Sequence, residues 1–577
     1  MPGPTPKPRD ATPRRTDRRP LGGFARAAAL VGASLLAASL LGTAAPSPAR
    51  ADDVAAAEAK YRAWLKRPSL YKRMQGRVAL ARTGTTKAIG LFADDYLRPE
   101  EPKDHVRYLI ATLATEQLSG APDAAAAFAG WRGRAKTPID AWLWYRALGV
   151  DLLLGGRDAA TVPVAPGEPA LLRAAALRAL ATASDTESPA VVAATLDALP
   201  TAGPERALLV ESCAAVARTW GMGIKDDATR AVVERIAKVL DDKSFSQDTH
   251  DIVARNLASL FQTDVLGPGA APYLRELAAA AERPEGSEPP EVKYAPGPFF
   301  GLRAVGRRIV YVIDASDSML VPLTPDELKV LRPTTPSDPK PGDKKLPKAA
   351  DDEDPLPWQR IKNRFDAARE VLKRSLRSMK PGQHYCVILF GNDARPLATT
   401  PNLVAVEPKA IEATVAELDR MKPEPAPGDK ARPHGKLRGE TNLHGGLRLA
   451  FRVTTDKRLG PGEYVDLSRT GCDGIYLLSD GNPTTDDFVK TDKPDGEKTV
   501  KDRETMTPVA PTGDINFQGP YGDRTFEQFD WVTDDVRRLN LFRQAEIHCV
   551  AIGEVDDTLL RGIADIGTGR FRRVGGD

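Results

Sequence analysis

Apolar positions in residues 52–283 recur at helical spacing, and strand-like runs of β-branched residues are nearly absent there. The stretch EPALLRAAALRALATA (168–183) has Pro169 in its first turn. The next stretch, SPAVVAATLDALP, has Ser188 as a cap and a proline at its end. Such helix pairs return at intervals of roughly 35–45 residues. The pattern therefore predicts an α-helical repeat domain.

This period resembles that of HEAT-like repeats, and the resemblance implies an α-helical solenoid over residues 52–283. An irregular helical bundle is the alternative. Trp131, Trp142 and Trp144 lie in the first part of this region and are expected in its core.

The pattern changes after a proline-rich linker at residues 284–303. From 304 to 577, apolar runs alternate with amphipathic stretches, which predicts a multidomain chain ending in an α/β Rossmann-like domain with a mostly parallel central sheet. We expect strands at 308–313, 384–390, 474–479, 546–552 and 570–574. Crossover helices are expected near 358–379, 408–421, 443–453, 528–542 and 556–566.

Three polar segments interrupt this domain, at about 321–357, 422–438 and 486–527. They are rich in Pro, Gly, Asp and Lys, so they are expected to be long loop insertions. Two of them leave from the strand ends described next, and we expect them to frame that edge of the sheet.

Hard oxygen donors follow two of the expected strands and precede one of the expected helices. The apolar run Ile309–Ile313 is followed directly by DASDS, a second strand ends in YLLSDGNPT, and the loop GETNLHGGL precedes a helix. Because the carboxyl ends of parallel strands open onto one edge of a sheet, these segments are expected to meet there. The donors are Asp314, Ser316, Ser318, Thr441 and Asp480.

A DxSxS motif, a loop threonine and an aspartate in a D-G turn are the pattern of the von Willebrand factor A (VWA) family, which residues 300–577 resemble. The resemblance implies a metal-ion-dependent adhesion site (MIDAS) whose ligands are the five donors just named. Asp317 stands where the family often has glycine. Its carboxylate is either a solvated surface charge or a ligand of a second cation.

The chemistry of the five donors agrees with this expectation. Two carboxylates and three hydroxyls favour Mg²⁺, Mn²⁺ or Ca²⁺ over zinc. With two negative ligands, the cation keeps positive charge that attracts an Asp or Glu of a protein partner. The alternative is that these residues are separate helix caps and turns. His434 and His444 flank Thr441. Lone loop histidines of this kind are expected to face solvent, and lining the rim of the site is the alternative.

No H-E-x-x-H, P-loop or G-x-S-x-G motif occurs in the chain. We therefore expect a non-enzymatic protein that binds a partner through the metal, with the helical repeats as a second interaction surface. One alternative is a structural scaffold in which the metal stabilises the fold and the solenoid does the binding. A metal-assisted hydrolase is less favoured.

The first 51 residues have the pattern of a signal peptide: a basic start, an apolar middle and Ala49-x-Ala51 as a cleavage site. Export to the periplasm or the extracellular space is expected, with no stable membrane span after cleavage; an uncleaved anchor is the alternative. The full chain has a formal net charge of +3, and most of its basic excess lies in this segment. Nucleic acid is therefore not an expected partner.

Four cysteines occur, none in a CxxC pair. They are Cys213, Cys386, Cys472 and Cys549. Most fall on separate expected elements, which favours buried free thiols over disulfides.

Overall fold

The computed structural model describes residues 51–67, 70–98, 104–153, 167–183, 188–221, 224, 226–283, 297–331, 356–421, 441–456, 469–484, 519–521, 529–553, 555 and 557–575. The expected signal peptide, apart from its last residue, and the expected loop at 422–438 lie outside them. So do residues 284–296 of the expected linker and most of the segments 321–357 and 486–527.

The first half is helical, as its periodicity predicts. Its α-helices are α2 (Ala51–Trp64), α3 (Leu70–Ala81), α4 (Thr86–Tyr96), α5 (Asp104–Leu118), α6 (Ala124–Arg134), α7 (Ala141–Leu153), α8 (Ala170–Ala183), α9 (Ser188–Asp197), α10 (Pro204–Ala217), α11 (Asp227–Lys238), α12 (Gln247–Leu260) and α13 (Ala271–Glu282). Side-chain caps begin several of them: the side chains of Thr85, Asp226 and Ser246 accept hydrogen bonds from the third residues of α4, α11 and α12.

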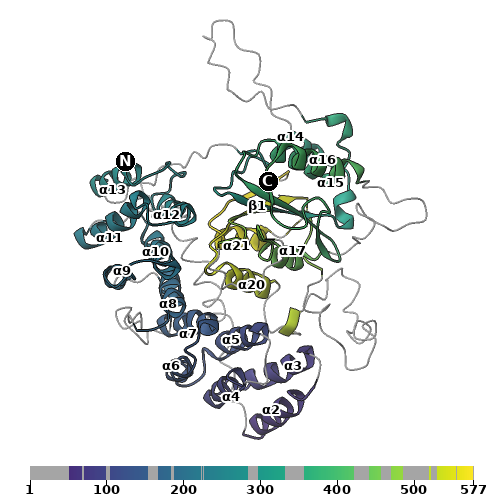
Figure 1. Cartoon of the computed structure of the whole chain (residues 1–577). Coiled ribbons are helices and arrows are strands. Elements are labelled where there is room, and N and C mark those ends of the chain that lie inside the picture. The colour runs from purple at the N-terminus through teal and green to yellow at the C-terminus, as the bar shows by residue number, and fades with distance from the viewer. Residues whose placement is uncertain are drawn as a thin grey trace, which may run out of the picture.

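From α7 onward the helices form two rows. Helix α10 packs between α8 and α12, and α11 packs against α9 and α13. We call α7, α8, α10 and α12 the inner row, because each of these helices contacts the second half, as described below. Trp131, Trp142 and Trp144 are buried, as predicted. Figure 1 shows α2–α13 as a curved array along one side of the molecule.

The second half contains a mostly parallel sheet with the predicted strands close to their predicted bounds. They are β1 (Arg308–Asp314), β2 (His384–Phe390), β3 (Ala394–Pro396), β4 (Val404–Ala405), β5 (Gly474–Ser479), β6 (Glu546–Ile552) and β7 (Phe571–Val574). Their order is β3-β2-β1-β5-β6-β7, and β4 also pairs with β2. The short strands β3 and β4, which run antiparallel to β2, were not predicted. They span three and two residues, too few to carry a periodic signal.

Helices cover both faces of the sheet. They are α14 (Pro325–Leu331), α15 (Arg364–Arg377), α16 (Pro408–Arg420), α17 (Leu443–Ala450), α20 (Asp530–Asn540) and α21 (Asp557–Ile566). Ile309, Tyr311 and Ile313 of β1 pack with α15 and α16. Val310 and Val312 pack on the other face with α17, α20 and α21. The apolar run of β1 is therefore buried on both sides, as its composition predicts.

Two expectations about irregular segments are corrected. Helix α14 forms inside the segment expected to be a loop at 321–357. The end of the expected linker belongs to the core, because Phe299 is fully buried and its ring lies 5.4 Å from that of Tyr311 and 4.9 Å from that of Tyr476. Burial of the Phe299 ring against these two tyrosines outweighs the loop-forming tendency of the prolines and glycines that precede Phe299.

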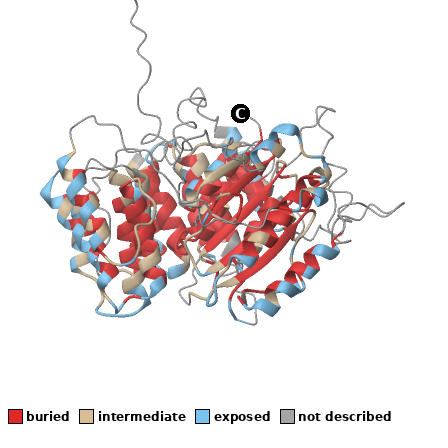
Figure 2. Ribbon diagram, turned by 90° about the horizontal axis from the view of Figure 1, so that it is seen from above, coloured by how far each residue is buried: buried red, intermediate tan, exposed pale blue. Residues whose placement is uncertain are grey.

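The two halves share one apolar cluster, which runs from the inner row into α17, α20, α21 and the adjacent face of the sheet. Polar contacts join them too: Arg146 of α7 lies 2.9 Å from Asp534 of α20, and Arg255 of α12 donates to the Gln544 carbonyl at 2.7 Å. Helices α20 and α21 lie between the sheet and the helical array in Figure 1, and Figure 2 shows buried residues on both sides of the contact.

The cysteines are free and buried, as predicted. Cys386 lies on β2 and Cys549 on β6, so two of them are on separate strands. None of the helices in the described ranges combines the length and apolarity that a membrane crossing needs.

Candidate functional site

The five predicted donors come from three segments at the carboxyl edge of the sheet. Asp314 is the last residue of β1, and Ser316 and Ser318 follow it. Asp480 follows β5, which pairs in parallel with β1. Thr441 comes two residues before α17, whose N-cap is Asn442. Adjacent parallel strands bring the first two segments together.

Asp314 is fully buried, and both of its oxygens accept hydrogen bonds. The backbone N–H of Ser316 donates to Oδ1 at 2.8 Å. The hydroxyl of Ser479, the last residue of β5, donates to Oδ2 at 2.6 Å. These bonds hold the carboxylate of β1 against the end of β5.

Three side chains form a hydrogen-bonded chain from the first segment to the second. The hydroxyls of Ser316 and Ser318 lie 3.0 Å apart. Ser318 then donates to Oδ1 of Asp480 at 2.6 Å. Ser316 and Asp480 are buried, whereas Ser318 is partly exposed. The DxSxS serines and the second aspartate are therefore neighbours in space.

Thr441 reaches the same place from the loop before α17. A Cβ atom at Gly481 would lie 3.5 Å from the Ser318 hydroxyl oxygen and 3.8 Å from that of Thr441. Thr441 is held to Thr484 by two hydrogen bonds, its N–H to the Thr484 hydroxyl at 2.7 Å and its carbonyl from the Thr484 N–H at 3.0 Å. All five predicted donors thus meet at one edge of the sheet.

Two acidic side chains in this cluster carry an electrostatic cost. Burial raises the pKa of Asp314, and the nearby charge of Asp480 raises it further. Burial also raises the pKa of Asp480, although the hydrogen bond from Ser318 and the ion pair with Arg364 oppose the rise. Both shifts mean that the site disfavours two negative charges without a compensating cation.

The donor set fits a hard divalent cation. Two carboxylates and three hydroxyls supply only oxygen, which suits Mg²⁺, Mn²⁺ or Ca²⁺. Within the described ranges, no group of three or more His, Cys, Asp or Glu side chains could hold a metal ion. A cation here would therefore depend on the serine and threonine hydroxyls together with Asp314 and Asp480.

Three further residues belong to the site and were not predicted. Ser479 binds Asp314, as described above. Arg364, the first residue of α15, places Nη1 3.2 Å from Oδ2 of Asp480 and Nε 3.1 Å from Oε1 of Glu327. Arg364 carried no sequence signal, because the crossover helix was expected near 358–379, which puts Arg364 inside the helix and not at its first residue. Glu327 gave no signal, since it lies in a segment expected to be a loop.

His444 does not face solvent, and that expectation is wrong. The residue is fully buried in α17, and its Nε2 lies 2.9 Å from Oδ2 of Asp535 in α20. Its ring packs edge-on against that of Trp531, with centroids 4.7 Å apart. His444 therefore joins two helices. His434 lies outside the described residues.

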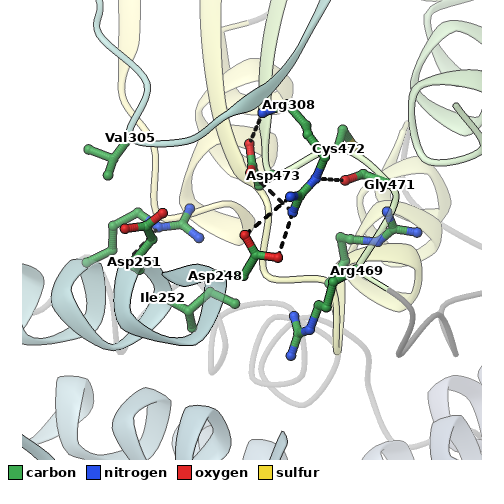
Figure 3. A pocket seen from close by; sticks show the side chains of 11 residues that line it. Asp248, Asp251, Ile252, Val305, Arg308, Arg469, Gly471, Cys472 and Asp473 are labelled. Atoms are coloured by element: carbon green, nitrogen blue, oxygen red, sulfur yellow. Dashed lines mark hydrogen bonds and ion pairs between the residues drawn. The ribbon is translucent and has the colours of Figure 1, made fainter. Parts of the chain in front are cut away.

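A second polar hollow lies at the opposite, amino-terminal end of β1, between the two halves. Arg308 donates to the Gly471 carbonyl there and pairs with Asp248 at 3.1 Å and Asp473 at 3.2 Å, as Figure 3 shows. Arg255 and Arg469 also line it. Its inner space admits only water-sized groups, so its charged side chains mainly pair across the contact between the halves.

The chain was compared with protein-family models and with curated proteins. No protein-family model matches the chain, and no curated protein matches it. The case for a function therefore depends on the sequence motif and on the geometry of the site.

Proposed function

We propose that this chain is an exported, non-enzymatic binding protein of the VWA type that contacts a protein partner through a divalent cation. Asp314, Ser316, Ser318, Thr441 and Asp480 would hold the cation, with Mg²⁺ favoured and Mn²⁺ or Ca²⁺ as alternatives. The convergence of these five donors from three segments is the observation that carries the proposal.

The chemistry required of the site is modest. The two carboxylates balance the charge of a divalent cation without making the site negative, and the five donors leave one position of an octahedral ion open to the carboxylate of an Asp or Glu of the partner. The chain's own residues set the position of that ion. The bonds from Ser479 and the Ser316 N–H orient Asp314, and the bond from Ser318 orients Asp480.

A structural scaffold is the second candidate, since two carboxylates buried this deeply would gain from a cation even without a partner. Since burial raises the pKa of both Asp314 and Asp480, a cation between them would stabilise the fold whether or not a partner is bound. In that case the helical repeats would do the binding.

Metal binding is the first test. Calorimetric titration of Mg²⁺, Mn²⁺ and Ca²⁺ into the protein lacking residues 1–51 should show saturable binding. Asp314→Ala should weaken it more than about tenfold, because it removes a charged ligand. Asp94→Ala is the control, since Asp94 pairs with Arg134 on the exposed surface of the helical half. Saturable binding that survives in Asp314→Ala would rule out this site.

Partner chemistry is the second test and separates the two candidates. A displayed peptide library should be selected on the protein with Mg²⁺ and eluted with acid, and each selected peptide should then be assayed both with Mg²⁺ and with a chelator. Enrichment of peptides with an Asp or Glu, lost for Asp314→Ala, supports metal-bridged binding. Selected peptides that bind equally well in chelator would instead favour the scaffold.

A further inference from the structure

Arg364 is a cation held against one of the two site carboxylates. Its Nη1 lies 3.2 Å from Oδ2 of Asp480, and its side chain is only 10% exposed. Its backbone N–H donates to the Val321 carbonyl at 3.2 Å, just beyond the DxSxS segment. The first residue of α15 is thus anchored beside the site by both its backbone and its guanidinium.

Glu327 fixes the guanidinium from the other side. Its Oε1 lies 3.1 Å from Nε of Arg364. Its Oε2 accepts from the Thr324 N–H at 2.6 Å, while the Thr324 hydroxyl accepts from the Glu327 N–H at 3.2 Å. This reciprocal pair is a capping box at the start of α14. Glu327 is therefore a buried, rigid acceptor.

The backbone leaves a slot for this ion pair at the ends of β6 and β7. A Cβ atom at Gly553, which follows β6, would lie 2.3 Å from Cζ of Arg364. One at Gly575, which follows β7, would lie 2.4 Å from Cγ of Glu327. Both glycines also have positive φ, of 84° and 82°. Only glycine leaves room for the two side chains there.

We propose that Arg364 is a built-in counter-ion of Asp480, which offsets the charge of this carboxylate when no divalent cation is bound and competes with the cation when one arrives. The inference rests on the metal site proposed above. If Arg364 served only to stabilise the fold, its ion pair with Glu327 would be sufficient. The second contact, to a carboxylate of the donor cluster, is what links Arg364 to the cation.

The direction of the effect follows from charge. A guanidinium and a divalent cation drawn to the same carboxylate repel each other, and screening is weak in a buried site. Arg364 therefore lowers the metal affinity of the site and stabilises its metal-free form. Glu327 acts in the opposite sense, because it holds part of the guanidinium away from Asp480 and adds negative charge.

The test measures Mn²⁺ affinity by calorimetry and the melting temperature with and without Mn²⁺, in the protein lacking residues 1–51. Arg364→Gln should raise the Mn²⁺ affinity at least about fivefold and widen the gap between the two melting temperatures. Glu327→Gln should lower the affinity by a similar factor. Arg369→Gln is the matched control: this arginine of α15 is also 10% exposed and pairs with Asp366 and Glu370, away from the site.

Each outcome decides the inference. Opposite changes in affinity for Arg364→Gln and Glu327→Gln, with Arg369→Gln unchanged, would support it. Unchanged or weaker binding in Arg364→Gln, with the wild type still binding Mn²⁺, would overturn the inference alone. If the wild type and all variants fail to bind Mg²⁺, Mn²⁺ or Ca²⁺, both the inference and the proposed function fall. Glu327→Gln keeps the test decisive if Arg364→Gln does not fold.

Discussion

Gly446 determines how closely α17, the helix that follows Thr441, approaches the sheet. Gly446 lies in the middle of α17, and a Cβ atom there would be 2.9 Å from Cγ1 of Val312 and 3.1 Å from Cδ1 of Phe390. Both neighbours are fully buried β-strand side chains. The absence of a side chain at Gly446 therefore lets α17 pack directly on β1 and β2, just beyond the donor cluster.

Gly446→Ala should lower the free energy of unfolding by about 1–3 kcal/mol, because the added methyl group overpacks a closed core. Urea unfolding followed by circular dichroism measures the change. Gly90→Ala is the control, since Gly90 is an exposed position within α4 and has open space around its missing Cβ. There the same substitution should stabilise the protein by about 0.5–1 kcal/mol. Equal effects at the two positions would contradict the packing argument.

Residue chemistry also explains which parts of the site could be predicted. Asp314 and Asp480 come at the ends of two apolar runs, and parallel pairing fixes these ends side by side, so the proximity of the two aspartates was predictable. Glu327 was not, because its role depends on Arg364, 37 positions away, across a polar segment that has no strand periodicity. The buried state of His444 was missed for the same reason: its partner Asp535 is 91 positions away.

Helices α17 and α20 are joined by a buried polar cluster beneath the donor site. His444 of α17 meets Asp535 of α20, and Asp535 also pairs with Arg538 at 2.7 Å. Burial raises the pKa of Asp535, but the charge of Arg538 and the bond to His444 outweigh it and hold the pKa well below its usual range. Asp535 is therefore a largely enclosed charge, with its side chain 10% exposed, and its cost is offset by these partners.

His444→Ala should lower the free energy of unfolding by about 2 kcal/mol, because it removes a buried side chain and one partner of the Asp535 carboxylate. Chemical denaturation at neutral pH measures it. His250→Ala is the matched substitution: its ring is half-buried in α12 and bonds only the Asp242 carbonyl, at 3.1 Å, among the interactions described for it. A loss for His444→Ala no greater than for His250→Ala would show that the cluster does not stabilise the fold.

The contact between the halves changes how the helical repeats can serve a partner. The inner row already packs on the α/β half through α7, α8, α10 and α12. Among the helices after α7, a partner of the helical repeats would therefore meet α9, α11 and α13 and not the packed faces of the inner row. The sequence did not predict this contact, because its pairs lie far apart along the chain: Arg146 and Asp534 are 388 positions apart. Local periodicity carries no information at that range.

The ion pairs at the base of β1 make this contact sensitive to acid. Burial raises the pKa of Asp248, but ion pairs with Arg308 and Arg307 outweigh it, so the pKa lies below its ordinary value of 3.8. A lowered pKa in the folded state contributes stability above pH 3.8, which is lost as the pH falls through the lower folded value. The contribution of Asp248 should therefore be complete near neutral pH and disappear in strong acid.

Asp248→Asn should reduce the free energy of unfolding at about pH 6, and its difference from the wild type should shrink as the pH falls below 3.8 into strong acid, where the folded wild-type carboxylate is protonated as well. Urea unfolding at a series of pH values measures both. Asp94→Asn is the control, because Asp94 and Arg134 form an exposed pair whose loss should cost less than about 1 kcal/mol at any pH. A difference for Asp248→Asn that stays constant with pH would mean that the position acts through packing. The charge pairs of Figure 3 would then not hold the two halves together.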